Sequence, residues 1–481
     1  MWQPALWILI GDWAIRIVFS IRIIMRPRSV GMSLAWLLVM LFPFVGTVVY
    51  LLMGENRLGY KRADWAARIR DRYQFWRSHQ SPFLFNSRYA VHSDPAQLAR
   101  MIYSASDALP FNGNQLKLLH CADDVFSAMI ADIDQATHSC DLEYYIWEVG
   151  GQADELAMRL ADAARRGVQC RILVDAVGSR GFLRSRQASE LTVAGVKIHA
   201  ALPVGLLRAL LYRFDLRLHR KIVVIDHAIG YVGSQNMADP KLFKRGAGFG
   251  QWVDAMVRIS GPAVDALAMV FFEDWQFETA PVPLSHELPT IPPVPPPSGQ
   301  STVQVIPSGP GLNSEAIMQI LLNAIYMADR ELILTTAYFV PDESLQRALI
   351  SAARRGVDVT IVVPARVDSR LVRLASRPFL RELVASGVHV ARYRDGMLHT
   401  KSISIDFDTS FFGSLNLDPR SLHLNFEIML AVFDDAFTKD LRGLQQQYVS
   451  RSDLLTVNDL AANSFFVRFA ENCVRLISPL L

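Results

Sequence analysis

Apolar residues are unevenly distributed along the chain, and the longest uncharged run lies near the N-terminus. Residues 31–53, GMSLAWLLVMLFPFVGTVVYLLM, contain no charged side chain. A helix of this length can cross the roughly 30 Å of hydrocarbon in a bilayer, and membrane helices tolerate kinks such as those expected at Pro43 and Gly46. The pattern therefore predicts a transmembrane helix rather than a buried core helix.

The preceding apolar segment, residues 4–24, carries two opposite charges. Asp12 and Arg16 are four residues apart, so they share one face of a helix and can pair there. We interpret the segment as a second crossing or a re-entrant helix, with a helix lying in the membrane interface as the alternative. Residues 1–62 are thus predicted to be a membrane anchor with one or two transmembrane helices, followed by a connector over 63–107.

Basic residues flank both apolar segments and bear on the orientation of this anchor. Three arginines lie between the segments, and a larger group of arginines and lysines follows the second one. Under the positive-inside rule the larger group favours a cytoplasmic main domain, although the three arginines act in the opposite direction.

The rest of the chain contains an internal repeat. The sequence AARRGV occurs at 163–168 and again at 352–357, each time after an amphipathic helical pattern and before a β-type run. Further along, LHRKIVVID matches LHTKSISID and VGSQN matches FGSLN, in the same order. These matches predict two α/β halves, 108–280 and 301–450, each with mixed or parallel strands and helices outside the sheet. The intervening residues, 281–300, are rich in proline and are predicted to be an extended linker.

An amphipathic pattern occupies the C-terminal segment, residues 451–481. An apolar stripe there includes Phe465, Phe466 and Phe469, with two arginines nearby. The pattern fits an interfacial helix and fits equally a helix that docks back on the main domain.

Bulk composition limits the possible functions. Apolar residues make up 51% of the 481 residues and charged residues 20%, which is sufficient for a folded core. The formal net charge of +3 argues against a dedicated nucleic-acid-binding protein. The four cysteines show neither a CxxC pair nor metal-ligand spacing, so we interpret them as reduced structural residues.

Both halves carry the pattern H-x-K-x-x-x-x-D at the same place in the repeat. Its residues are His219, Lys221 and Asp226 in the first half and His399, Lys401 and Asp406 in the second. A lone copy is weak, because a histidine is often a satisfied core residue and a lysine a solvated one. Two copies in equivalent positions, each followed by G-S-x-N, favour the functional interpretation.

The chemistry of a phosphodiester explains why these residue types occur together. One imidazole can attack phosphorus while the other protonates the leaving oxygen and later acts as a base. The lysines would hold the phosphoryl oxygens, and the two aspartates would orient or charge-balance the imidazoles. The four residues that we expect to donate hydrogen bonds to phosphate oxygens and ring nitrogens are Ser234, Asn236, Ser414 and Asn416. Residues two apart on a strand share a face, so each histidine and its lysine are predicted to project together.

The paired motifs resemble the phospholipase D superfamily, and most closely its bacterial cardiolipin synthase branch. The resemblance extends over almost the whole chain, including residues 35–54, the sequence RLHRKIVVID, Trp252 with Asp254 in GQWVDAMVRISG, Asn425 with Glu427 in LNFEIML, and the final SPLL. It implies a bilobal phospholipase D fold with one active site at the seam, a covalent phosphatidyl-histidine intermediate, and no metal or other cofactor. It also implies that His219 is the nucleophile and His399 the acid/base.

By the same resemblance, Asp254, Asn425 and Glu427 would support the histidines, although ordinary ion pairs at strand ends remain the alternative. Tyr144, Tyr145, Trp147 and Tyr338 end β-type runs; they either line the cleft or pack in the core.

The implied reaction joins two phosphatidylglycerol molecules into cardiolipin and releases glycerol, at a bacterial inner membrane, with no nucleic acid as partner. Three rivals stay open: a phospholipase D hydrolase that releases phosphatidic acid, a nuclease of the same superfamily, and an inert membrane scaffold. The oligomeric state and the headgroup preference stay open too.

Overall fold

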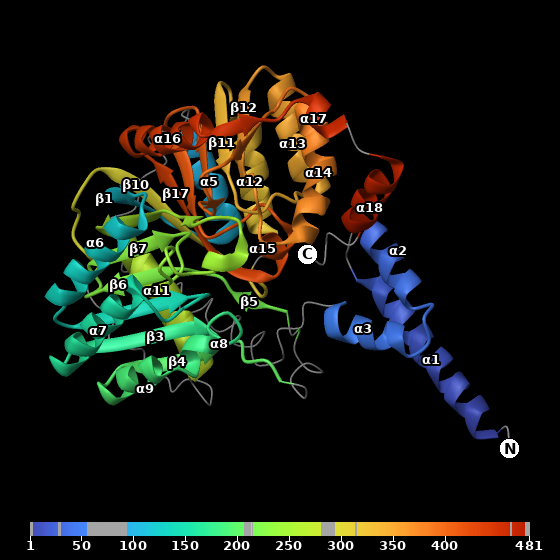
Figure 1. Cartoon of the computed structure of the whole chain (residues 1–481), viewed down its shortest axis with the longest axis horizontal. Coiled ribbons are helices and arrows are strands. Elements are labelled where there is room, and N and C mark those ends of the chain that lie inside the picture. Colours follow the sequence, from blue (N-terminus) through green and yellow to red (C-terminus); the bar gives the residue numbers. More distant parts are fainter. Residues whose placement is uncertain are drawn as a thin grey trace. The chain divides into compact units, whose positions relative to one another are not determined.

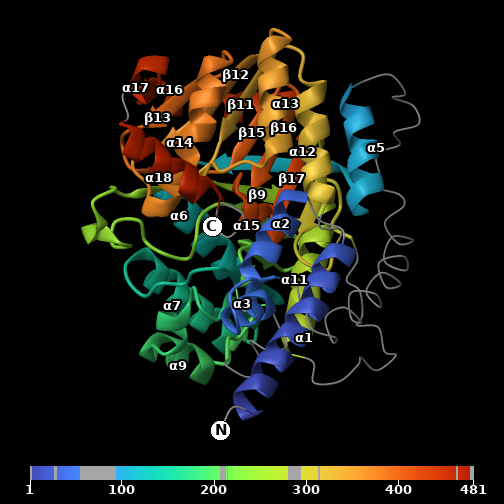
Figure 2. The same ribbon diagram turned by 90° about the vertical axis from the view of Figure 1, so that its right-hand side faces the viewer.

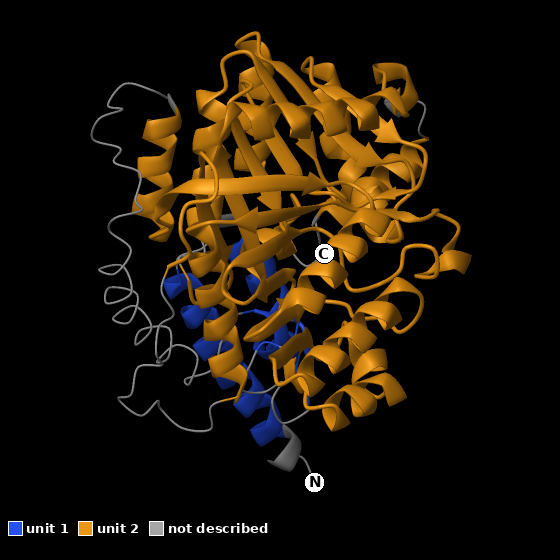
Figure 3. Ribbon diagram, turned by 90° about the vertical axis from the view of Figure 1, so that its left-hand side faces the viewer, with its two compact units in different colours: residues 1–64, 204–216 blue, residues 65–203, 217–481 orange. Residues whose placement is uncertain are grey.

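The computed structural model describes residues 3–26, 30–54, 94–205, 213, 215–279, 294–312, 315–461 and 464–476 (Figures 1 and 2). The chain divides into two compact units, residues 1–64 with 204–216 and residues 65–203 with 217–481 (Figure 3). Most of the proline-rich segment expected to be a linker lies outside the described residues, as do all residues between 54 and 94.

The described part of the smaller unit contains α1 (Gln3–Met25), α2 (Val30–Val39) and α3 (Val45–Met53). The prediction of one continuous helix over residues 31–53 is wrong, because the chain turns between α2 and α3. Pro43 lies in this turn; it has no backbone N–H to donate and its ring collides with the preceding helical turn. Among the described residues, no helix is both long enough and apolar enough to cross a bilayer.

Asp12 and Arg16 of α1 supply hydrogen bonds that this turn lacks. The two side chains pair with each other at 3.0 Å. Asp12 accepts from the backbone N–H of Phe44 at 3.0 Å, and Arg16 donates to the carbonyl oxygens of Met40 at 3.3 Å and Leu41 at 3.1 Å. A helix end leaves backbone donors and acceptors without intrahelical partners. The charged pair hydrogen-bonds such groups at the break between α2 and α3.

The larger unit is built on one continuous mixed sheet whose two halves repeat the same strand order. The first half contributes β1 (Pro110–Leu119), β2 (Ser139–Tyr144), β3 (Gln169–Asp175), β4 (Lys197–Ala201), β6 (Ile222–Ile225), β7 (Ile229–Gly233) and β9 (Met256–Ser260). The second half contributes β10 (Ser301–Ser308), β11 (Glu331–Thr335), β12 (Asp358–Pro364), β13 (His389–Tyr393), β15 (Ser402–Ile405), β16 (Thr409–Gly413), β17 (Asn425–Phe433) and the short β18 (Ser452–Leu454).

The strand order shows how the repeats join. From one edge it runs β4-β3-β2-β6-β7-β9-β1 and then β10-β17-β16-β15-β11-β12-β13-β18. Strands β2, β3 and β4 are parallel, as are β11, β12 and β13, while β1 and β10 pair antiparallel at the junction. The predicted α/β fold with two repeated halves and mixed strands is therefore confirmed.

Helices cover both halves of this sheet (Figure 1). In the first half they are α6 (Ala122–Gln135), α7 (Gln152–Arg165), α8 (Arg180–Leu183), α9 (Arg186–Val193) and α11 (Ala263–Thr279), with a 3₁₀ turn at Arg245–Ala247. In the second half they are α12 (Ala316–Met327), α13 (Glu343–Arg354), α14 (Arg370–Ala385), α15 (Pro419–His423) and α16 (Asp435–Ser450).

The repeated sequence AARRGV has a structural role at the ends of α7 and α13. Its second arginine hydrogen-bonds the last carbonyl groups of the preceding helix: Arg166 donates to Ile133 and Asp134 of α6, and Arg355 donates to the corresponding end of α12. The following glycines, Gly167 and Gly356, have φ of +94° and +96°, a conformation that favours glycine at a helix C-terminus. This repeat therefore marks helix ends rather than a site.

Two helices outside the repeats pack on the second half. Helix α5 (Asp94–Ser106) lies beside α12 (Figure 2), and the buried Gln304 side chain donates to the carbonyl oxygens of Ala99 and Ala108. Part of the predicted connector is thus an integral helix of the main unit.

At the other end of the chain, α17 (Val457–Ala461) and α18 (Phe465–Leu476) follow the second repeat. Helix α18 packs on α14, where its buried Glu471 pairs with Arg377 at 3.0 Å and Arg381 at 2.9 Å. The same helix leaves Phe465, Phe466 and Phe469 exposed. Docking and an exposed apolar stripe, which the sequence presented as alternatives, thus occur together.

Candidate active site

His219 is positioned by a short strand from the first half that pairs with the second half. Strand β5 (Arg217–Leu218) runs parallel to the start of β17, with Leu218 opposite Phe426. One residue further, the N–H of His219 donates to the carbonyl of Phe426 at 2.9 Å. This register brings Glu427 to the imidazole, and Nδ1 of His219 lies 2.9 Å from Oε2 of Glu427.

His399 is positioned by the mirror arrangement. Strand β14 (Met397–Leu398) runs parallel to β8 (Trp252–Val253), and the N–H of His399 donates to the carbonyl of Val253 at 2.8 Å. Nδ1 of His399 then lies 2.7 Å from Oδ1 of Asp254. Each histidine is therefore held by a carboxylate that belongs to the other half, so neither half holds its own histidine.

Both carboxylates are buried and receive further hydrogen bonds. Ser414 donates to Glu427 at 2.5 Å and Asn425 donates to it at 3.2 Å, while Ser234 donates to Asp254 at 2.6 Å. Burial raises the pKa of each carboxylate, but the facing histidine, lysine and serine outweigh it and hold that pKa below its usual value. Both carboxylates are therefore ionised acceptors.

The serines of the two G-S-x-N motifs do not have the role expected from the sequence. Their hydroxyl hydrogens are donated to Asp254 and Glu427, so they are not available to a phosphate oxygen. Asn236 accepts from the backbone N–H of Ile146 at 3.2 Å, and Asn416 is buried. The serines thus orient the carboxylates that orient the histidines.

The histidines are neutral in this environment. Burial lowers the pKa of His219 to about 4, against the pull of Glu427 and with the help of Lys221. Burial likewise lowers the pKa of His399 to about 3, with Lys401 acting in the same direction. A neutral imidazole that donates Nδ1–H to a carboxylate has its free electron pair on Nε2. That nitrogen is the one able to attack phosphorus or exchange a proton.

The two lysines bring positive charge to the same place. Lys221 and Lys401 are almost fully buried, and each ammonium group donates to the carbonyl oxygen of its own motif's histidine. Burial lowers the pKa of Lys221 to about 8 and that of Lys401 to about 7. Buried cations with spare donors are suited to the nonbridging oxygens of a phosphodiester. The strands themselves begin one residue later, at Ile222 and Ser402, so the histidine and lysine precede the strand rather than lying on it.

The prediction that Asp226 and Asp406 orient the imidazoles is wrong. Asp226 accepts from the backbone N–H groups of Thr137, His138 and Ser139 at 2.7–2.8 Å. Asp406 accepts in the same way from residues 329–331. Both aspartates therefore fix the chain where β2 and β11 begin, and the carboxylates at the histidines are Glu427 and Asp254.

Aromatic rings flank each histidine differently. The Tyr145 ring lies 5.0 Å from that of His219, and the Trp252 ring lies 4.2 Å from that of His399. Tyr144 and Trp147, also considered for the cleft, pack in the core of the first half. Tyr338 donates to Asp368 at 2.6 Å.

Arg220 is a contributor that the sequence analysis missed. It is buried, donates to the carbonyls of Glu427 at 3.0 Å and Ser308 at 3.3 Å, and pairs with Asp274. It thereby ties the His219 segment to two strands of the other half. Its signal in the sequence was a charged residue between a histidine and a lysine, at a position where the second half has Thr400.

The histidine pKa values predict an acid-sensitive fold. An unfolded histidine titrates near 6.5, whereas the folded values are about 4 and 3, so the unfolded state binds more protons as the pH falls below 6.5. The free energy of unfolding should therefore decrease by about 1.6 kcal/mol per histidine between pH 6.5 and pH 5. Urea unfolding at the two pH values measures this. A double His219→Ala, His399→Ala variant should lose that part of the pH dependence. An unchanged dependence in this variant would show that the histidines titrate in the folded protein as they do in the unfolded chain.

Comparison with known proteins identifies the family. The family described as "Cardiolipin synthase, PLD-like domain" matches residues 129–275 and 321–447, more than half of the chain. The chain belongs to this family. A further family, "Phospholipase_D-nuclease N-terminal", matches residues 14–55. The "Cardiolipin synthase A" proteins of Serratia proteamaculans (strain 568) and Erwinia tasmaniensis are each 42% identical over 486 residues, covering 99% of this chain and 98% of theirs.

A solved structure supports the fold of this family member. The crystal structure of phosphatidylserine synthase from Haemophilus influenzae Rd KW20 superposes with a TM-score of 0.59, covering 80% of this chain and 100% of that one. At 16% identity, this likeness concerns the fold alone.

Proposed function

We propose that the chain is a cardiolipin synthase, a phosphatidyltransferase that joins two phosphatidylglycerol molecules into cardiolipin and glycerol. The observation that carries this proposal is the pair of buried histidines, each held through Nδ1 by a carboxylate of the opposite half and each accompanied by a buried lysine. The choice of lipid substrates follows from the relatives named "Cardiolipin synthase A", which match over nearly the whole chain.

In the first step, Nε2 of His219 attacks the phosphorus of the donor lipid. The bond from phosphorus to the glycerol headgroup breaks, and His399 gives its proton to the departing oxygen. Lys221 and Lys401 stabilise the negative charge that builds on the nonbridging oxygens. The phosphatidyl group is then bonded to His219, and His399 is neutral.

In the second step, the terminal hydroxyl of an acceptor phosphatidylglycerol attacks the same phosphorus. His399 takes the hydroxyl proton, the phosphorus–nitrogen bond breaks, and both histidines return to their starting states. The low pKa of His399 needs a countercharge for the first step: the phosphodiester anion, bound between the lysines, favours the protonated imidazole. Water would compete with the acceptor, so a dry site favours transfer over hydrolysis.

We also propose that residues 1–62 anchor the enzyme in the bacterial inner membrane, with the catalytic halves 108–280 and 301–450 on the cytoplasmic side. Helices α1, α2 and α3 expose many large apolar side chains, and the Asp12–Arg16 pair satisfies the backbone of the turn between α2 and α3. Backbone groups within a bilayer must be satisfied internally. The arrangement supports the re-entrant alternative over a straight second crossing.

The anchor can be tested with Val18 and Leu41, which are exposed on this unit. An aspartate in hydrocarbon costs roughly 3 kcal/mol, so Val18→Asp with Leu41→Asp should move most of the protein from the carbonate-resistant membrane fraction to the supernatant. Val18→Leu with Leu41→Ile should stay in the pellet. Retention of the double aspartate variant would contradict the anchor.

Product analysis tests the proposed reaction. Purified full-length protein is incubated with phosphatidylglycerol vesicles, and the lipids and glycerol are measured by mass spectrometry. Cardiolipin and glycerol in equal amounts support the proposal. Phosphatidic acid without cardiolipin would make the enzyme a hydrolase. No change in any lipid would overturn both the transferase and the hydrolase interpretation.

A further inference from the structure

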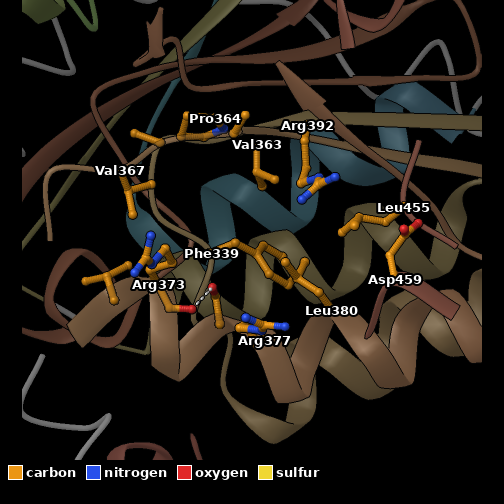
Figure 4. A pocket seen from close by; sticks show the side chains of 14 residues that line it. Phe339, Val363, Pro364, Val367, Arg373, Arg377, Leu380, Arg392, Leu455 and Asp459 are labelled. Carbon is orange, nitrogen blue, oxygen red and sulfur yellow. Dashed lines mark hydrogen bonds between the residues drawn. The ribbon is translucent and has the colours of Figure 1, made fainter. Parts of the chain in front are cut away.

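A cavity of about 330 Å³ lies in the second half, apart from the histidine pair (Figure 4). It is formed where β12 and β13 end and is bordered by α14. Phe339, Leu380 and Leu455 form apolar parts of its wall, while Arg373 and Arg377 reach it from α14 and Arg392 from β13 (Figure 4). A cavity with several guanidinium groups and an apolar wall is suited to a ligand that has both an anionic and an apolar part.

The charge around this cavity is not balanced by its own residues. Arg377 pairs with Glu471, but among the described residues the Arg373 side chain has no hydrogen bond or ion pair, and the buried Nε of Arg392 has no hydrogen-bond partner. Asp459 is the acidic residue of the lining; its Oδ2 accepts from the backbone and side chain of Thr456, and the charge of Arg392 helps to lower its pKa. The exposed guanidinium of Arg373 and the Nε of Arg392 can therefore donate to an oxyanion, and guanidinium groups bind phosphate through paired hydrogen bonds.

The surroundings favour a lipid over free phosphate. Arg373 and Arg377 belong to α14, and α18 packs on this helix and exposes Phe465, Phe466 and Phe469. Exposed aromatic side chains on an amphipathic helix are typical of a surface that contacts acyl chains at a membrane interface. The cavity thus lies on a helix whose neighbour presents a lipid-compatible face.

The cavity shares part of its wall with side chains that pack near His399. Its wall includes Ala337 and Val367, which pack in one hydrophobic cluster with Trp252. The ring of Trp252 lies 4.2 Å from that of His399, so one packed layer of side chains separates the cavity from His399.

We propose that this cavity binds the phosphate of the acceptor phosphatidylglycerol before its headgroup hydroxyl attacks the phosphohistidine. The proposal rests on the proposed function. Cardiolipin formation brings two phosphodiesters to one enzyme, and only one of them can lie between the two histidines. The second needs separate cationic donors, which Arg373 and Arg392 provide.

The test separates the two half-reactions. Exchange of labelled glycerol into phosphatidylglycerol requires the donor step and its reversal but no acceptor lipid, whereas cardiolipin formation requires both lipids. Arg373→Gln with Arg392→Gln should leave glycerol exchange within twofold of wild type and raise the KM for cardiolipin formation at least tenfold. Arg354→Gln with Arg370→Gln, exposed arginines outside the cavity lining, is the matched control and should leave both unchanged.

Loss of exchange and transfer together, or loss of neither, would overturn the acceptor site. Titration of the His219→Ala protein with dioctanoyl phosphatidylglycerol gives an independent readout. Two binding sites are expected, and one when the two arginine changes are added. A single site in His219→Ala itself would overturn the proposal, as would inorganic phosphate binding at the arginines as tightly as the lipid. If the wild type makes phosphatidic acid instead of cardiolipin, the proposed function fails while the binding titration still decides whether the cavity takes a lipid.

Discussion

His399→Ala is expected to give an enzyme that forms the covalent intermediate from an activated donor and then stops. With phosphatidyl-p-nitrophenol the leaving group departs without a proton, so His219 can attack although the general acid is missing. The second step still needs a base for the incoming hydroxyl. One equivalent of p-nitrophenol should therefore appear in a burst, and the mass of the protein should increase by one phosphatidyl group on His219.

His219→Ala should show neither the burst nor the adduct. With phosphatidylglycerol itself, where the leaving oxygen needs a proton, both variants should lose at least about 10³-fold in turnover. Burst kinetics and peptide mass spectrometry measure these outcomes. An adduct on His399 in the His219→Ala protein would reverse the two roles, which the repeat symmetry alone does not distinguish.

The repeat explains how much of the fold could be predicted from the sequence. Because AARRGV, H-x-K and G-S-x-N recur in the same order, two equivalent α/β halves were expected, and strands β2 to β4 and β11 to β13 follow the same plan. The pairing of β1 with β10, which makes one sheet of the two halves, joins residues far apart in sequence and has no local signal. The break between α2 and α3 had a signal in Pro43, but the uncharged length of residues 31–53 outweighed it in the prediction.

The candidate site, too, could be predicted only in part from the sequence. The types and positions of His219, Lys221, His399 and Lys401 follow from the motifs, and family resemblance pointed to the two supporting carboxylates. The motif aspartates were misassigned because sequence spacing indicates which residues are near along the chain, whereas the partner of each histidine comes from the other half.

Because each histidine is oriented by a carboxylate of the other half, its orientation depends on how the two halves pair. A histidine whose tautomer depends on the opposite half is correctly oriented only when β5 pairs with β17 and β14 pairs with β8. The two histidines are therefore positioned together by the pairing of the two halves. Substitution of one carboxylate should therefore impair the histidine of the other half and the reaction step in which that histidine acts.

Glu427→Gln is accordingly expected to slow formation of the intermediate, and Asp254→Asn its breakdown. The amide in either variant no longer accepts the Nδ1–H as an ion, so the imidazole loses its fixed tautomer and the stabilisation of its charged form. A loss on the order of 10²–10⁴ in kcat is expected for each. With phosphatidyl-p-nitrophenol, the burst of p-nitrophenol should be slow in Glu427→Gln. In Asp254→Asn the burst should be nearly normal, and the steady-state turnover after it should be slow.

The pH dependence should change as well, since these carboxylates also raise the pKa of the lysines. Burial is the larger effect and holds the pKa of Lys221 at about 8 and of Lys401 at about 7, but Glu427 and Asp254 oppose it. Removing either negative charge lets the facing lysine lose its proton at lower pH, so the alkaline fall of kcat/KM should move to lower pH in both variants. Asp141→Asn, which removes a nearly buried carboxylate that pairs with Arg171 away from the site, should leave the profile in place. An alkaline limb that stays unmoved in Glu427→Gln and Asp254→Asn would mean that the lysines do not need their protons to bind the phosphodiester, and the charge-stabilising role assigned to them would fall.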